Sequence, residues 1–326
     1  MNHSLTIRLA TKEEVGKYFY EWPRGEHWNP CLGVTDFFYS SDPNGFFLGT
    51  VKNEQGHDTV VAIISALKHN PEMVFIGHYI VHPDHRGKGY GLALFNHAVK
   101  DYSKGVKYIG LDAVHAQMNN YKKSGFNILS WNSRRYQGTF EQTDLAKRME
   151  KNRDYLTNAG LEIKPLSETP LQSLIQLEKK YAGIEREAFI KQVATTFKNP
   201  SEGKFGISLV KKNDPNQVVA YAAIRPLTDG YIIGPIYAEN KQQTSTLVCH
   251  LIDVIHTESE KSTYQINKDH SKTFCANVCE GNKEALDIFE NDFGWTWAFQ
   301  CYRMWIGEAP PSDVSGLYAA ATYESG

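Results

Sequence analysis

The chain has 326 residues, a length that suits two domains better than one. Charged residues make up 22% and hydrophobic residues 41%, which excludes a disordered or fibrous chain. The 35 Lys and Arg nearly balance the 37 Asp and Glu, so a general nucleic-acid binder is not expected.

The cysteines and the apolar segments indicate the cellular compartment of the protein. Five cysteines are few and odd in number, which favours reduced intracellular thiols over a disulfide framework. Cys275 and Cys279 lack a second Cys or His pair at metal-ligand spacing, so we predict no metal site. Residues 1–10 lack a signal-peptide core, and the most apolar stretch, 60–67, is too short to cross a bilayer. We predict a cytoplasmic protein without membrane contact.

Strand and helix patterns alternate in the first half of the chain. Thr6–Leu9 is a short strand, and Thr11 and Glu14 form a capping box that opens a helix over 11–20. A loop rich in aromatic and turn residues follows. After it we expect strands at 46–51, 59–67 and 73–81, a helix at 91–102, a strand at 108–114, a short helix at 116–124 and a strand at 126–131.

The second half repeats this order. We expect strands at 161–165, 205–210, 218–224, 231–237, 274–278 and 295–305, with helices at 167–181, 245–255 and 284–289. Residues 76–81 align with residues 233–238 at an offset of 157. The sequence therefore predicts two units of one kind, residues 1–142 and 161–306. A polar connector, 143–160, joins them, with a helix left open as an alternative, and a loose tail, 307–326, follows.

One segment between a predicted strand and a predicted helix carries a chemical signal. It reads Val81-His82-Pro83-Asp84-His85-Arg86-Gly87-Lys88-Gly89-Tyr90-Gly91. Its three glycines permit backbone conformations and close approach that side chains forbid. The main-chain N–H groups at the helix start, the helix dipole and the charges of Arg86 and Lys88 make an anion site suited to a pyrophosphate.

Two familiar phosphate motifs do not fit this segment. A dinucleotide-binding site would place the glycines after an early strand and an acidic residue about 20 residues later. A P-loop needs Gly-Lys-Ser/Thr after a four-residue gap, which is missing here.

The segment resembles the acetyl-CoA motif of the GNAT N-acetyltransferases, Arg/Gln-x-x-Gly-x-Gly/Ala, preceded here by Val81-x-Pro83. A second marker, Tyr121-Lys122-Lys123-Ser124-Gly125-Phe126, is similar to the family's Tyr-x-x-x-Gly-Phe. The resemblance covers roughly residues 5–140 and is closest to tandem forms with a degenerate second half. It implies an α/β (α+β) fold of two tandem GNAT units, each a mixed, largely antiparallel sheet with a splayed central strand pair flanked by helices.

The resemblance also implies acetyl-CoA as co-substrate, with no metal. The coenzyme-binding residues that it carries over are Tyr79, Ile80, Val81, Arg86, Gly87, Lys88, Gly89, Tyr90 and Gly91. An N–H of Tyr79 or Ile80 would meet the thioester carbonyl. Tyr121 would face the coenzyme sulfur and protonate the departing thiolate, since a phenol of pKa near 10 keeps its proton at neutral pH. The alternative for Tyr121 is an ordinary core tyrosine.

The base that deprotonates the amine is a choice among several residues. His78 is the titratable group within the central strand, but strand alternation puts it opposite Tyr79 and Val81 unless a bulge resets the parity. A buried structural histidine is the alternative. We expect the acceptor site in the aromatic loop, and its candidate residues are Glu26, Trp28, Asn29 and Asp36.

The second half departs from the coenzyme pattern. Glu239-Asn240-Lys241-Gln242-Gln243 replaces the glycine turn, and 289–295 contains no tyrosine. We expect this half to close the acceptor site or to replace a partner subunit. The sequence thus predicts an acetyl-CoA-dependent N-acetyltransferase, a monomer or weak homodimer, that acts on an amine by direct attack. A non-catalytic acyl-CoA sensor or scaffold and a transferase for longer acyl groups are the alternatives.

Overall fold

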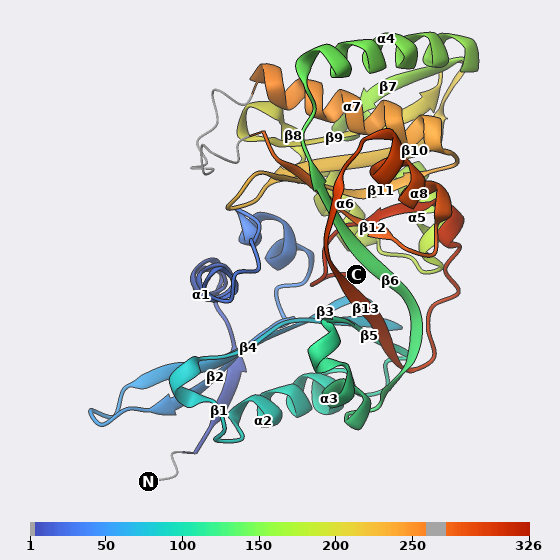
Figure 1. Ribbon diagram of the computed structural model, residues 1–326. Coiled ribbons are helices and arrows are strands. Elements are labelled where there is room, and N and C mark those ends of the chain that lie inside the picture. The colour runs from blue at the N-terminus through green and yellow to red at the C-terminus, as the bar shows by residue number, and fades with distance from the viewer. Residues whose placement is uncertain (1–3, 259–271) are drawn as a thin grey trace.

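The strands of both halves join into one twisted sheet, which the helices cover (Figure 1). The computed structural model describes residues 4–258 and 272–326. Within them the strand order is β1-β2-β3-β4-β5-β13-β6-β12-β14-β11-β10-β9-β7, with β8 beside β9. The strands are β1 (Thr6–Leu9), β2 (Phe46–Lys52), β3 (Asp58–Asn70), β4 (Met73–Val81), β5 (Tyr108–Ala113), β6 (Phe126–Gly138), β7 (Leu161–Pro165), β8 (Lys198–Asn199), β9 (Lys204–Lys211), β10 (Asp214–Pro226), β11 (Tyr231–Ala238), β12 (Phe274–Cys279), β13 (Thr296–Gly307) and β14 (Leu317–Ala320).

The helices of each half pack on its part of the sheet. The first half has α1 (Lys12–Gly25), the π-helical η1 (Thr35–Tyr39), α2 (Tyr90–Asn96), which continues as the π-helical η3 (His97–Tyr102), and α3 (Met118–Lys123). The second half has α4 (Gln142–Ala159), α5 (Leu171–Ala182), α6 (Glu187–Thr196), α7 (Lys241–Glu258), α8 (Lys283–Asp287) and the π-helical η9 (Ile288–Asp292). Five short 3-10 turns complete the described residues: η2 (Pro83–His85), η4 (His115–Gln117), η5 (Leu166–Glu168), η6 (Pro200–Glu202) and η10 (Val314–Gly316).

The two halves exchange strands at the centre of the sheet. Strand β13, from the second half, lies between β5 and β6 of the first: Tyr302 is opposite Ala113 on one side and Asn132 on the other. Strand β6 in turn lies between β13 and β12. The crossing of these two long strands connects the halves in Figure 1. The first half therefore needs a strand of the second to complete its sheet.

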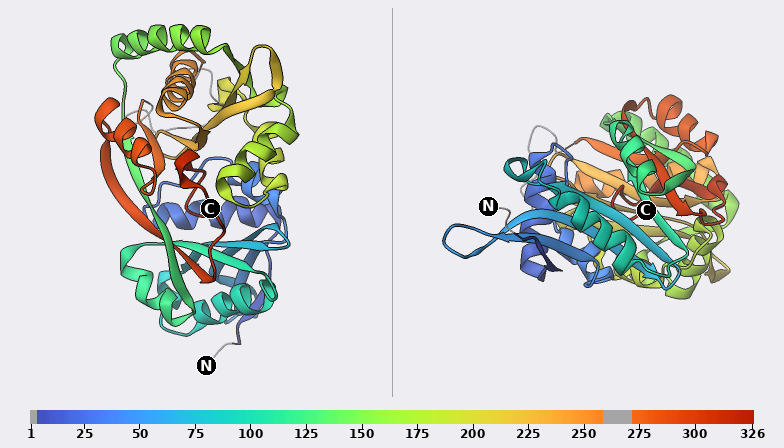
Figure 2. Two further views of the ribbon diagram at one scale, coloured as in Figure 1. Left: turned by 90° about the vertical axis from the view of Figure 1, so that its right-hand side faces the viewer. Right: turned by 90° about the horizontal axis from the view of Figure 1, so that it is seen from below.

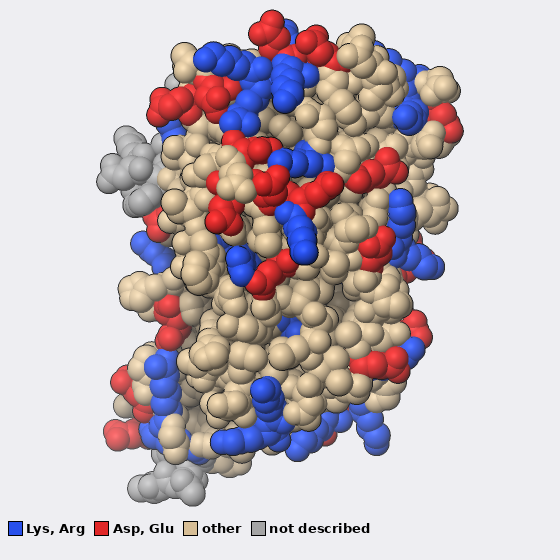
Figure 3. All heavy atoms as spheres, turned by 45° about the vertical axis from the view of Figure 1, so that its right-hand side comes forward, with Lys and Arg blue, Asp and Glu red and all other residues tan. Residues whose placement is uncertain are grey.

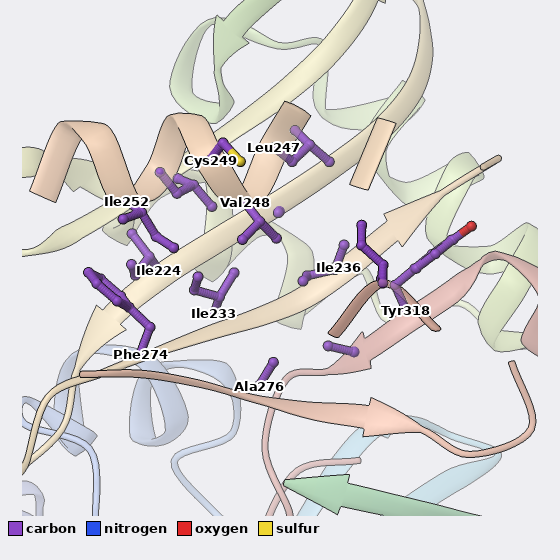
Figure 4. Packing of buried hydrophobic residues seen from close by; sticks show 14 of the residues in the cluster. Ile224, Ile233, Ile236, Leu247, Val248, Cys249, Ile252, Phe274, Ala276 and Tyr318 are labelled. Carbon is purple, nitrogen blue, oxygen red and sulfur yellow. The ribbon is translucent and has the colours of Figure 1, made fainter. Parts of the chain in front are cut away.

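Helix α7 covers the sheet of the second half and makes its largest core. Its apolar face, with Leu247, Val248 and Ile252, packs on side chains of β10, β11 and β12 (Figure 4). Tyr318 of β14 belongs to the same core. In the first half α2 and η3 pack in a similar way on β3 and β4, through residues such as Leu94 and Ala98.

The tail is built into the molecule, and the prediction of a loose tail was wrong. β14 pairs with β11 and with β12, and residues 317–323 are buried. Main-chain carbonyls of Ala321 and Ser325 accept hydrogen bonds from Arg225 and His69, respectively. The chain's last described residues lie between the two halves (Figure 2). Small residues, which suggested disorder in the sequence, let the tail pack closely here.

Most predicted elements form where the sequence places them. The capping box is present, with Thr11 accepting from the Glu14 N–H and Glu14 accepting from the Thr11 N–H. The connector is the helix α4 (Gln142–Ala159). Strand β6 is much longer than predicted, and α6 and β14 were not predicted.

The surface mixes charges of both signs over the upper part of the face in Figure 3, as the near-neutral composition suggests. Within residues 4–258 and 272–326, no helix combines the length and the apolar character that crossing a membrane requires.

Candidate functional site

Strands β4 and β5 separate halfway along their length and open a cavity. They pair in parallel from Met73 opposite Tyr108 to Ile76 opposite Leu111, and the pairing then stops. Beyond that point lies a cavity of about 680 Å³. Its lining comes from Gly77–Val81 of β4, from Leu111 and Asp112 of β5, and from residues of the second half.

Among the described residues, the main chain of β4 beyond Ile76 has no strand partner on the side of the gap, and the Val81 carbonyl there accepts from Arg86 Nε. The His82 N–H donates to the Val61 carbonyl of β3 at 3.0 Å. Because alternate residues of a strand direct their N–H and C=O groups to opposite neighbours, Val81 and Tyr79 direct theirs into the gap. Ile80, opposite Ile63, faces β3. Of the two expected donors for a carbonyl in the gap, the geometry favours the Tyr79 N–H.

A β-bulge at His78 changes the alternation of β4. Ile80 is opposite Ile63 and Gly77 opposite Ser65, so β4 carries one extra residue, and His78 has a φ of +47°. The bulge resets the parity relative to the start of the strand. His78 nevertheless stays on the Ile80 side, away from Tyr79 and Val81, and lines the cavity from there.

His78 is buried and held from several sides. Its Nδ1 lies 3.0 Å from Ser65 Oγ, and its ring packs edge-on against Phe19 and Phe38. Among the described residues none forms a hydrogen bond with Nε2. Burial lowers the pKa of His78, although the charge of Glu324 acts in the opposite direction. The imidazole is therefore neutral near pH 7 and able to accept a proton.

The glycine turn has the open backbone that the motif predicts. Gly87 and Gly89 have φ values of +75° and +81°, which L side chains rarely adopt, and an added Cβ would meet nothing within 4 Å. Gly91 is needed for another reason, because a Cβ there would lie 2.6 Å from both the Tyr79 hydroxyl and a Val81 methyl. The turn thus offers open N–H groups at the start of α2.

Both cations of the glycine turn, Arg86 and Lys88, interact with nearby groups of the first half. Arg86 Nε donates to the Val81 carbonyl at 3.0 Å, and its guanidinium forms an ion pair with Glu26. Lys88 Nζ donates to the Asp84 carbonyl at 2.9 Å. The Arg86–Glu26 pair connects the turn to the end of α1, and both residues line the cavity.

Tyr121 lies against the cavity on helix α3. Its ring packs on Phe95 with a centroid separation of 5.7 Å. Burial raises the pKa of Tyr121 above its ordinary value, and the neighbouring Tyr79 and Cys301 raise it further. The phenol therefore keeps its proton throughout the neutral range.

The four predicted acceptor residues separate into two pairs. Glu26 and Trp28 line the cavity. Asn29 does not, because its amide exchanges two hydrogen bonds with the main chain of Asp229 in the second half. Asp36 likewise points to the second half, where its carboxylate lies 2.7 Å from Lys204 Nζ.

The second half contributes lining residues that the sequence did not indicate: Phe299, Cys301, Tyr323 and Glu324. Phe299 and Cys301 arrive on β13, and Tyr323 and Glu324 on the tail. No motif in the first half predicts these four residues, since they lie more than 150 residues from the glycine turn. The similar order of elements in the two halves was the one available hint of an exchange.

Comparison with known proteins identifies the family. Residues 9–126 match the Acetyltransferase (GNAT) family, and residues 174–319 match an Acetyltransferase (GNAT) domain. The chain belongs to the GNAT family of acyltransferases. The predicted tandem arrangement and the predicted fold class are confirmed.

Full-length relatives support this assignment. The chain is 28% identical to a holothin acyltransferase from Pseudoalteromonas sp. (strain SANK 73390), over 98% of this chain and 94% of the relative. A proposed acetyltransferase from Pyrococcus horikoshii has a similar structure, with a TM-score of 0.67, 17% identity and coverage of 99% and 96% of the two chains. A tandem GNAT protein from the clavulanic acid biosynthesis pathway gives a TM-score of 0.57 at 13% identity, over 95% of this chain and all of that one.

The second GNAT unit has its gap filled by the chain itself. β11 and β12 pair in parallel at Tyr231 and Ile232 and then separate, as β4 and β5 do. β14 occupies the space between them: Ala319 is opposite Ile236 on one side and Val278 on the other. The site that remains open is therefore in the first unit.

Proposed function

We propose that the chain is an N-acetyltransferase that moves the acetyl group of acetyl-CoA to a primary amine. The observation that carries the proposal is the open gap between β4 and β5, whose cavity reaches Arg86 at the start of the glycine turn and is lined also by Tyr121 and His78. Phosphate, arm and thioester of the coenzyme require groups in this order along one path. Direct attack of the amine, through a tetrahedral intermediate, fits the groups present.

The residues present suit each part of acetyl-CoA. The turn 86–91, with open space at Gly87 and Gly89 and two cations, would hold the pyrophosphate. The main chain of Tyr79 and the N–H of Val81 would hydrogen-bond the pantetheine arm as a neighbouring strand would. The Tyr79 N–H would then stabilise the negative charge that develops on the thioester oxygen.

Two side chains would move the protons. His78, neutral because burial lowers its pKa, would take the proton that the ammonium must lose before nitrogen can attack. Tyr121 would give its proton to the departing sulfur, and the proton of the newly bonded nitrogen would restore the phenol. The products are an amide, a free thiol and one proton released to solvent.

Cys301 raises the question of an acyl-enzyme intermediate. Strand β13 brings Cys301 to the cavity, far from the glycine turn in the sequence. Burial raises the pKa of its thiol, and the charge of Asp112 raises it further. Because the thiolate is the nucleophile, a thiol held in its neutral form is a poor carrier, and this supports direct transfer.

The acceptor side of the cavity is lined by residues of both halves. The curated relative's name gives holothin as the molecule that it acylates. We propose a small-molecule amine for this chain too, bound between Glu26 and Trp28 of the aromatic loop and the residues of the second half.

The test measures acyl-CoA binding by calorimetry and thiol release over a library of amines. Tyr121→Phe should lower turnover by ~100-fold with unchanged acetyl-CoA affinity, because it removes only the proton donor. Tyr102→Phe is the control, since its hydroxyl bonds Asp42 outside the cavity. Normal turnover in Tyr121→Phe would exclude Tyr121 as the acid, and binding without thiol release for any amine would contradict the enzyme and favour a sensor.

A further inference from the structure

The tail carries a carboxylate from the second GNAT unit into the cavity of the first. After β14 fills the gap of the second unit, the chain continues to Tyr323 and Glu324, which line the open cavity. Glu324 packs directly on Gly77, where β4 and β5 separate: a Cβ on Gly77 would lie 2.7 Å from the Glu324 carbonyl oxygen. Glycine at this position is what allows the tail to lie against β4.

Hydrogen bonds on both sides fix the position of Glu324. Thr322 Oγ1 accepts from the N–H groups of Glu324 and Ser325, at 3.1 and 3.0 Å. His69 Nε2 donates to the Ser325 carbonyl at 2.7 Å, and Arg186 donates to the Gly326 carbonyl at 2.9 Å. The carboxylate therefore projects from a backbone that is tied to both units, which suits a binding group.

Glu324 differs from the other acidic residues of the cavity. Glu26 is paired with Arg86, and Asp112 is paired through two hydrogen bonds with Arg303. Among the residues that the structure describes, none forms a hydrogen bond or an ion pair with the half-buried Glu324 carboxylate.

The neighbouring cation, Arg135, is directed elsewhere. It donates to Asn277 Oδ1 at 2.9 Å, lies over the rings of Phe299 and Tyr323, and is not part of the cavity lining. The charges of Arg135 and Glu324 attract each other without an ion pair, so a cation bound in direct contact would stabilise the half-buried carboxylate further.

The cavity offers aromatic surface around this charge. Trp28 comes from the loop after α1, Phe299 from β13 and Tyr323 from the tail. Trp28 and Phe299 are about 40% exposed, at 40% and 39%, so their rings remain available to a ligand. Flat apolar groups pack well on such rings, and a nearby ammonium gains from their faces as well.

We infer that Glu324 binds the ammonium group of the acceptor, and that the acceptor is a monocationic primary amine on a flat apolar body. The inference rests on the proposed function, since it concerns the acceptor side of the same site. It places the ammonium close to His78, on which the charge of Glu324 acts directly. A zwitterionic amino acid is disfavoured, because its carboxylate would bring a second negative charge beside Glu324.

Calorimetry on the protein saturated with coenzyme A tests the inference without requiring turnover. The probes are 2-phenylethylamine, L-phenylalanine and 2-phenylethanol, which share a body and differ in charge. The amine should bind at least about tenfold more tightly than the other two. Glu324→Gln should weaken the amine at least about tenfold and leave the alcohol and coenzyme A unchanged.

Glu308→Gln is the matched control, because Glu308 also belongs to the 307–326 tail but lies before β14 and pairs with Lys107 on the surface. It should bind all probes as the unmodified chain does. The inference is overturned if the unmodified chain does not bind 2-phenylethylamine, if L-phenylalanine binds as tightly, or if Glu324→Gln binds the amine normally.

Thiol release from acetyl-CoA separates this inference from the proposed function. Amine binding that depends on Glu324, without thiol release for any amine, keeps the inference and contradicts the acetyltransferase. Thiol release with an amine KM that is unchanged in Glu324→Gln supports the acetyltransferase and contradicts the inference about Glu324. A melting temperature equal to that of the unmodified chain shows that the variant is folded.

Discussion

Gly89 caps the start of helix α2 in a left-handed conformation, and the proposed coenzyme site depends on it. Its φ is +81°, and an added Cβ would point into open space rather than into the protein. Gly105 has the same properties, with a φ of +80° and nothing within 4 Å, but lies in a turn away from the cavity. Substitutions at Gly89 and Gly105 should therefore cause similar backbone strain, and only the one at Gly89 should affect a ligand.

We predict that Gly89→Val and Gly105→Val lose similar stability, about 1–2 kcal/mol, because both force a β-branched residue into a left-handed conformation. Only Gly89→Val should weaken acetyl-CoA binding, by at least about tenfold, since its side chain stands where the phosphates approach. Urea unfolding and calorimetry measure the two effects. Equal acetyl-CoA affinity in both variants would place the phosphates elsewhere.

Residues within one short motif were predictable, whereas residues assembled across the chain were not. The glycine turn and Tyr121 could be proposed from the sequence because the motifs that contain them span only a few residues. Glu324 and Cys301 reach the cavity through strand pairing over about 200 residues of chain, which no local pattern records. Asn29, by contrast, lies in a loop whose residue types suggested a binding site, but in the structure its amide donates a hydrogen bond to the Asp229 carbonyl.

At the scale of the elements, the place of β14 bears on how many coenzymes the proposed function allows for each chain. The first GNAT unit leaves the gap between β4 and β5 open, and the second closes the equivalent gap between β11 and β12 with its own strand. In the second unit, a pantetheine arm would need the main-chain groups of β11 that already pair with β14. A second coenzyme would have to displace a buried strand that carries Leu317 and Tyr318 into the core.

We predict that calorimetry gives one acetyl-CoA per chain. Gly89→Val, which affects the first unit alone, should weaken this single isotherm as a whole, and no tighter second component should remain. A stoichiometry of two, or binding of normal affinity that persists in Gly89→Val, would show that β14 leaves its gap.

The strand exchange explains why the order of elements was easier to predict than their partners. The patterns of 126–131 and 295–305 predict a strand in each segment, and strands form there as β6 (Phe126–Gly138) and β13 (Thr296–Gly307). A period of two residues identifies the faces of a strand but not the neighbour with which it pairs. In each unit the neighbour beside the splayed pair comes from the other unit, so the sheet closes only in the complete chain.

At the scale of the whole molecule, His69 connects the first unit to the tail. It lies on β3, is buried, and its Nε2 donates to the Ser325 carbonyl at 2.7 Å. Burial lowers the pKa of His69 from 6.5 to about 3, and the charge of Arg186 contributes in the same direction. The folded protein therefore keeps this imidazole neutral under conditions in which the unfolded chain binds a proton.

The sign of the pH effect follows from this difference. Since the unfolded chain holds more protons below pH 6.5, acidification favours unfolding, by about 1.4 kcal/mol per pH unit for one such group. The contribution is fully present above pH 6.5 and is lost progressively as the pH falls toward 3. Other buried histidines add slopes of their own, so the His69 share needs a difference between variants.

We predict that acidification from pH 7 to pH 5 lowers the free energy of unfolding of His69→Gln by about 2 kcal/mol less than that of the unmodified chain. The glutamine amide can still donate a hydrogen bond to the tail. Urea unfolding at the two pH values, with constant m-values, measures this difference. His57→Gln, in the exposed turn between β2 and β3, is the control and should keep the full slope. An unchanged slope in His69→Gln would mean that the tail leaves His69 before the molecule unfolds. In that case Glu324 would leave the cavity with the tail, and amine binding would fall at pH 5 while the fold persists.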